Sequence, residues 1–138
     1  MGIGGNMKNN KRGWKVVFVI IACFVVSAIY DAFTVRDIVA PAHPLFISIF
    51  ILIADLMILL GAYCYAFNKN LISSKLFWLV VIVFFFIVNG IAVIYELVNN
   101  QIGYEVYDMI TMAAFYLCFS FLLATPTIMH LKNMNKVR

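Results

Sequence analysis

The sequence predicts an all-α membrane protein: four transmembrane helices in an up-down antiparallel bundle, with both termini in the cytoplasm. Of the 138 residues, 65% are hydrophobic and only 12% are charged, whereas a soluble domain is about half apolar and about a quarter charged. Four apolar stretches are long enough to cross a bilayer, and the basic residues gather on one side of them. This composition excludes an ordinary soluble enzyme, a disordered chain and a disulfide-stapled secreted domain.

Each apolar stretch meets the length requirement of a membrane helix, since a hydrocarbon core of about 30 Å needs about 20 helical residues. The predicted spans cover about residues 14–33, 45–67, 76–95 and 108–129. Their continuous apolar runs lack the in/out alternation of a β-barrel strand. The connectors are too short for a second domain, so we expect residues 1–138 to form a single four-helix transmembrane domain.

The spans differ in what interrupts them. The first has no charge between Lys15 and Asp31, and it could alternatively be a cleaved signal peptide. The second contains Asp55 near its middle, the third carries no charge, and the fourth has none after Asp108. Pro126 predicts a kink near the end of the fourth span.

Charge predicts the orientation. The basic residues on one side of the spans are Lys8, Lys11, Arg12, Lys15, Lys69, Lys75, Lys132, Lys136 and Arg138. Only Arg36 is on the other side, together with most of the acids. Because positive charge resists translocation, the basic face is predicted to be cytoplasmic. We favour attraction to anionic lipid as its further role over docking of a soluble cytosolic partner protein, and we expect no direct nucleic-acid binding.

The cysteines, histidines and tryptophans are interpreted as structural residues rather than as redox, metal-binding or haem-binding residues. Cys23, Cys64 and Cys118 each lie inside a span without a CxxC spacing, so we expect neither a redox pair nor a metal site. His43 and His130 fall at opposite membrane faces and cannot ligate a haem together. We therefore expect no cofactor. The tryptophans at residues 14 and 78 are interpreted as amphipathic anchors at the membrane interface.

Asp55 is the residue with the largest free-energy cost of membrane insertion, because a carboxylate near the bilayer midplane costs about 2.5–3.5 kcal/mol to insert. No basic residue lies in any span to pair with it, which favours the protonated carboxyl group as a hydrogen-bond donor. The neutral candidate partners in this intramembrane polar site are Asn89, Ser27, Thr111 and Ser120. Two interpretations remain open: a proton or ligand site, and the favoured one, interhelical hydrogen bonding that fixes the register of the helices.

Helical spacing places polar and small residues in stripes on all four spans, and we expect these stripes to face one another. They are densest in the outer half, where the acidic residues Asp31 and Glu96 predict a polar pocket open to the outside. The three phenylalanines at 84–86 are expected partly toward lipid. Pairs of small residues four apart, such as Cys23 with Ser27, predict close helix approach and favour a homo-oligomer.

In span number, loop length and size the chain resembles, in outline, three unrelated groups. These are the small multidrug transporters, the immunity proteins against pore-forming colicins, and the small membrane subunit of Kiwa-type bacterial antiphage systems. The transporters carry their essential acid in the first span, whereas Asp55 lies in the second. The resemblance implies a bacterial inner-membrane protein of defence or toxin immunity.

The leading functional hypothesis is a non-enzymatic polytopic inner-membrane subunit. It would oligomerise and act as sensor, anchor or immunity factor through protein contacts. The alternative is a small proton-coupled transporter or channel centred on Asp55. A membrane enzyme acting on lipid or quinone is third, since the sequence offers no nucleophile–base pair.

Overall fold

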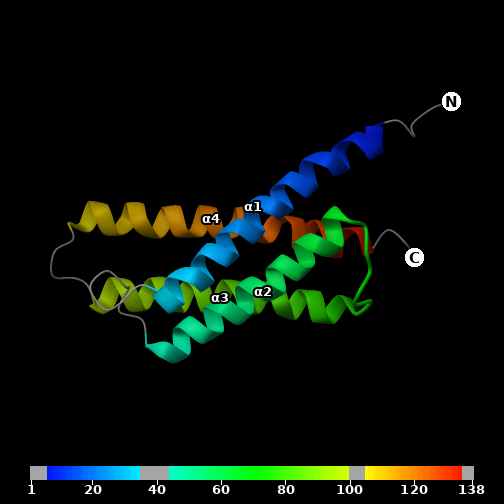
Figure 1. Cartoon of the computed structure of the whole chain (residues 1–138). Helices are drawn as coiled ribbons and strands as arrows, with labels where there is room; N and C mark the ends of the chain where they lie inside the picture. Colours follow the sequence, from blue (N-terminus) through cyan, green and yellow to red (C-terminus); the bar gives the residue numbers. More distant parts are fainter. Residues whose placement is uncertain (1–5, 35–43, 100–104, 135–138) are drawn as a thin grey trace.

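The computed structural model describes residues 6–34, 44–99 and 105–134, with side chains from residue 12 to 30 in the first of these ranges. Its elements are α1 (Asn6–Thr34), α2 (Leu45–Ala66), α3 (Lys75–Asn99) and α4 (Val106–Met134) (Figure 1). All four helices contain segments that are long and apolar enough to cross a membrane. The prediction of four apolar helices of membrane-spanning length is therefore confirmed.

The helix boundaries follow local chemistry. α2 begins directly after Pro44, whose carbonyl oxygen accepts hydrogen bonds from the amides of Ile47 (2.9 Å) and Ser48 (3.3 Å). α1, α3 and α4 extend beyond the predicted apolar stretches. A helix can continue past its apolar segment because its backbone hydrogen bonds are made within the helix and do not depend on apolar side chains. α4 also continues as one helix through Pro126.

α2 is the central element, because it contacts each of the other three helices, while α3 and α4 also contact each other. One core cluster joins α2, α3 and α4 through residues that include Ala54, Phe85 and Ala124. A second cluster joins α1 to α2 through Ile21 and Val25. α1 therefore packs on α2, and in Figure 1 these two helices run along the same diagonal and cross α3 and α4 obliquely.

Aromatic contacts bring the beginning of α1, the end of α2, the beginning of α3 and the end of α4 to one end of the molecule. Trp14 packs edge-on against Tyr65 at 5.1 Å between ring centroids. Trp78 packs in the same way against His130 at 5.2 Å. We call this region the connector end, after the connector 67–74 that joins α2 to α3 (Figure 1). The far end is the opposite one, where Leu45 begins α2.

The three phenylalanines at residues 84–86 of α3 divide between the core and the surface. Phe85 is fully buried in the core cluster of α2, α3 and α4, and Phe84 and Phe86 pack partly buried against it. Trp78, Val81, Phe85, Val88 and Ala92 form the buried face of α3. This face follows the three- and four-residue spacing of a helix, so the packing of α3 decides which ring turns inward.

Candidate functional site

α2 and α4 approach each other closely near the connector end. Thr127 of α4 is fully buried, and its hydroxyl donates a hydrogen bond to the carbonyl oxygen of Ile58 in α2 at 3.1 Å. A methyl group added at Gly61 would overlap the side chain of Thr127. The absence of a side chain at Gly61 therefore allows the last turns of α4 to lie directly against α2.

The connector begins with a helix-capping motif. Asn68 has a left-handed backbone with φ of 54°, a conformation that asparagine tolerates better than most residues. The amide of Asn68 donates to the carbonyl of Tyr65 at 3.3 Å, and the amide of Lys69 donates to the carbonyl of Cys64 at 2.9 Å. This pair of hydrogen bonds is a Schellman motif, which satisfies carbonyl groups at the end of α2 and fixes the direction of the exit.

Trp78 fixes the rest of the connector. Its indole N–H donates to the carbonyl oxygen of Ile72 at 2.9 Å, and its side chain is fully buried. The Ser74 hydroxyl accepts a hydrogen bond from the amide of Phe77 at 3.3 Å and so caps the first turn of α3. The interpretation of Trp78 as an interface anchor was wrong, because the structure places its ring inside the protein against His130.

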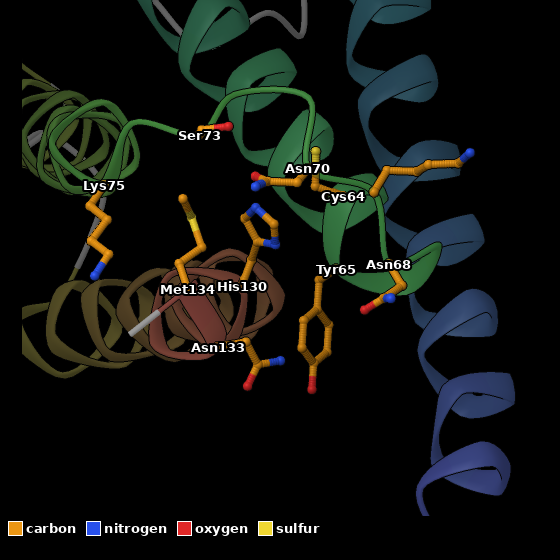
Figure 2. Close-up of a pocket in the computed structure, with 10 residues that line it drawn as sticks. Cys64, Tyr65, Asn68, Asn70, Ser73, Lys75, His130, Asn133 and Met134 are labelled. Carbon is orange, nitrogen blue, oxygen red and sulfur yellow. The ribbon is translucent and has the colours of Figure 1, made fainter. Parts of the chain in front are cut away.

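A pocket of about 650 Å³ lies between the connector and the last turns of α4 (Figure 2). This volume is within the range of about 300–1,000 Å³ typical of small-molecule sites. The residues that line it are Cys64, Tyr65, Asn68, Lys69, Asn70, Ser73, Lys75, His130, Asn133 and Met134. The lining combines amides, hydroxyls and two lysines, and it contains no acidic residue among those described.

His130 is the most constrained polar side chain of this pocket. It is only 7% exposed, and its Nε2 atom is buried without a hydrogen-bond partner among the described residues. An unpaired buried polar atom of this kind costs about 1–3 kcal/mol. Figure 2 shows the ring rising from α4 toward the connector, on the side of Asn70. The Trp78 ring contacts the His130 ring edge-on from α3.

The described members of the predicted basic face lie on elements that meet at the connector end. They are Arg12, Lys15, Lys69, Lys75 and Lys132. The Lys15 ammonium lies 5.4 Å from the centroid of the Phe67 ring, a cation–π contact between α1 and the end of α2. The side chains of Lys8 and Lys11, and all of Lys136 and Arg138, lie outside the described residues.

The predicted intramembrane polar site is not joined by hydrogen bonds. Asn89 donates to the carbonyl of Phe85 at 2.9 Å, four residues earlier in its own helix. Thr111 donates in the same way to Tyr107 at 2.8 Å, and its side chain is exposed. Within the part of the chain that the structure describes, no hydrogen bond or ion pair connects either residue to Asp55, which is half-buried.

Ser27 and Ser120 differ in burial. Ser27 is exposed on α1, and no hydrogen bond joins it to Asp55 among the described residues. Ser120 is buried on α4, one turn from Ala124, while Asp55 follows Ala54 on α2. Because the two alanines belong to the same core cluster, Ser120 and Asp55 lie at neighbouring levels of adjacent helices.

Neither of the two acidic residues predicted in the outer half is among the residues that line the pocket at the connector end. Glu96 is half-buried on α3, and the side chain of Asp31 lies outside the described residues. The described pocket is instead at the connector end, formed by residues brought together from α2, the connector, α3 and α4. The sequence offered only weak signals for it: a histidine at a helix end and an asparagine-rich connector.

The three cysteines differ in their relation to the pocket, because Cys64 lines it and Cys23 and Cys118 do not. Cys64 is fully buried, and Cys23 and Cys118 are exposed free thiols. Among the described residues, no group of three or more histidine, cysteine or acidic side chains could hold a metal ion. His43 lies outside the described residues.

No protein-family model, curated protein or solved structure matches the chain. The helices themselves define the class, because four helices of this length and apolarity indicate an integral membrane protein.

Proposed function

We propose that the chain is a non-enzymatic polytopic subunit of a bacterial inner membrane, which oligomerises and acts through protein contacts as sensor, anchor or immunity factor. In this proposal α1 to α4 cross the bilayer as an up-down antiparallel bundle with both termini in the cytoplasm. The one-sided distribution of lysine and arginine supports this orientation. The connector end then meets the cytoplasm, where a soluble partner protein could dock on its basic residues.

The observation that carries the proposal is the exposure of small and polar side chains on α1 and α4. Cys23 and Ser27 are exposed on α1, as are Thr111 and Cys118 on α4. The rings of Phe24 and Phe119 lie 5.2 Å apart and bring the middles of the two helices together. Small and polar residues favour close contact between membrane helices. Their exposure in a single copy supports their being covered by a second chain.

Disulfide cross-linking tests this interface in native membranes. The starting variant has alanine in place of the exposed Cys23 and Cys118 and keeps the buried Cys64. We expect Ser27→Cys in this background to give a covalent dimer on mild oxidation. The matched control is Val26→Cys, because Val26 is 63% exposed but points about 100° away around the helix. Equal cross-linking from both positions, or none from Ser27→Cys, would refute an interface on this face.

The orientation has its own test. Reporter domains fused separately to the two chain ends are expected to be active only as cytoplasmic reporters. A periplasmic signal from either end contradicts the up-down bundle with cytoplasmic termini, whatever the cross-linking shows.

A second function is favoured by Asp55, which is half-buried in the middle of α2 without a hydrogen bond or ion pair in the described part of the chain. Carboxyl groups at this depth commonly serve proton or ion pathways. The alternative proposal is therefore a small proton-coupled transporter or channel. In proteoliposomes, Asp55→Asn should abolish proton-coupled flux while the helical content and oligomer size persist. Full flux in this variant removes the alternative.

A further inference from the structure

We propose that the pocket at the connector end binds a phosphate group through His130, Lys75 and neighbouring amides. The phosphate group could belong to the headgroup of an anionic phospholipid or to a soluble phosphate. Both sources present the same chemistry to the protein, a compact anion with several strong acceptor oxygens. Binding of a soluble phosphate does not depend on how the chain is oriented in the membrane. Binding of a lipid headgroup rests on the proposed function, in which the connector end lies at the surface of a leaflet.

The walls of the pocket are fixed by contacts that do not involve a ligand. The Schellman motif at Asn68 sets the first turn of the connector, and the indole of Trp78 holds the connector at Ile72. On the opposite wall, Thr127 holds α4 against α2 one turn before His130. The walls of the pocket are therefore held by hydrogen bonds within the protein, and the pocket does not need a ligand in order to form.

His130 supplies the observation that points to a ligand. The side chain is more than nine-tenths buried, lines the pocket, and has an Nε2 atom without a hydrogen-bond partner among the described residues. A histidine Nε2–H is a donor in one neutral tautomer and in the charged form. A phosphate oxygen in the pocket would accept this hydrogen bond and remove the cost of leaving the atom unpaired. The His130 ring also packs edge-on against the buried Trp78 ring, with 5.2 Å between the ring centroids.

The remaining lining residues select an anion. Lys69 and Lys75 contribute two positive charges, and the amides of Asn70 and Asn133 add N–H donors. No acidic residue is among the described lining, so a divalent cation would meet net repulsion. The volume of about 650 Å³ also leaves space beside a phosphate for the rest of a lipid headgroup.

The lysines have a competing structural role. α2 and α4 both end at this pocket, and the carbonyl groups at a helix C-terminus carry partial negative charge that lysines stabilise. If this were their only role, removing Lys75 would lower stability by the same amount with and without phosphate. Binding predicts instead that the variant loses the response to phosphate, and this difference separates the two roles.

Thermal unfolding of the purified full-length protein in a neutral detergent tests the proposal. One arm titrates inorganic phosphate against chloride at equal ionic strength. The other titrates short-chain phosphatidylglycerol against short-chain phosphatidylcholine. A ligand that binds only the folded state raises the melting temperature in a saturable manner. We expect such a rise with inorganic phosphate, with phosphatidylglycerol or with both, and the responding arm identifies the source.

Three variants locate the response. His130→Phe keeps an aromatic ring against Trp78 but removes Nε2, and it should weaken the apparent affinity at least about ten-fold. Lys75→Gln should weaken it with little disturbance of the fold, because Lys75 is not fully buried. Lys132→Gln removes the same charge from an exposed site on α4 that does not line the pocket, and it should leave the affinity unchanged.

Two results would overturn the inference. The first is that neither inorganic phosphate nor phosphatidylglycerol raises the melting temperature in a saturable manner above its control, chloride or phosphatidylcholine. The second is equal weakening by Lys75→Gln and Lys132→Gln together with an unchanged response in His130→Phe, which would indicate general charge attraction rather than this pocket. Neither result bears on the reporter fusions or the cross-linking, so the inference and the proposed function fail separately.

Discussion

The two ends of the molecule use similarly apolar helices but pack them differently. At the connector end, Trp78 and Thr127 are fully buried, and α2 and α4 approach closely at Gly61. At the far end, Leu45 is 79% exposed and Val106 is 74% exposed. Helices in lipid are held together by close packing and hydrogen bonds, because lipid tails are as apolar as leucine. Both ends are apolar enough for lipid, and among the described residues the interhelical hydrogen bond of Thr127 and the close contact at Gly61 both lie toward the connector end.

The difference also separates the interaction partners of the two ends. Buried polar groups at the connector end, such as His130, require partners of their own. The large apolar side chains of the far end are suited to lipid or to another chain. Four predictions of the free energy of unfolding test whether stability is concentrated at the connector end.

The largest effect is expected at Trp78, which supports the connector and the His130 ring. Trp78→Ala should lower the free energy of unfolding by about 3–5 kcal/mol, because it leaves a large cavity and removes the hydrogen bond to Ile72. Denaturant unfolding in detergent measures this change. Leu76→Ala is the control, since Leu76 lies two residues earlier with its side chain 70% exposed. A loss below about 1 kcal/mol from Trp78→Ala would show that the connector end is not the stable part.

The next effect is expected at Gly61. A methyl group there would overlap Thr127, so Gly61→Ala should force α2 and α4 apart and lower the free energy of unfolding by about 1–3 kcal/mol. Gly90→Ala is the matched control, because nothing lies within 4 Å of the position of its added methyl group. Alanine is the better helix former, so this control should be neutral or slightly stabilising. Equal losses from the two variants would remove the close contact as the cause.

A smaller effect is expected at Thr127. Thr127→Val keeps the shape of the side chain and removes the interhelical hydrogen bond to Ile58, so we expect a loss of about 0.6–1.7 kcal/mol. Thr125→Val is the control, because the Thr125 hydroxyl bonds only within α4, to the carbonyl of Phe121 at 2.7 Å. The same unfolding measurement applies, and a control that loses as much as Thr127→Val contradicts a role for the interhelical bond.

The smallest effect is expected at the far end. Ile110 is 64% exposed, so Ile110→Ala should change the free energy of unfolding by no more than about 0.5 kcal/mol. The measurement is repeated at two protein concentrations in detergent. If Ile110→Ala lowered the free energy of unfolding by several kcal/mol, and by an amount that depends on protein concentration, another chain would have to bury the far end. The far end would then contribute to stability as the connector end does.

The sequence determined the elements of the fold. Apolar runs of sufficient length predict helices in lipid, since a bilayer leaves no water to satisfy an open backbone. The start of α2 at Leu45 agrees with the predicted span and follows Pro44, because a proline disfavours helical backbone at the residue before it. The expected intramembrane polar site around Asp55 depended instead on which stripes face each other, and hydrogen bonds of Asn89 and Thr111 turn back to their own helices.

Only the tertiary structure decided the pocket and the burial of Trp78. A tryptophan near a span end has the same sequence signal whether it anchors at an interface or packs inward. Its burial depends on α3 packing against α4, and the neighbouring His130 is more than fifty residues away along the chain. Local periodicity contains no information about which helix lies opposite, because that choice is made by the shape of facing surfaces such as Gly61 and Thr127.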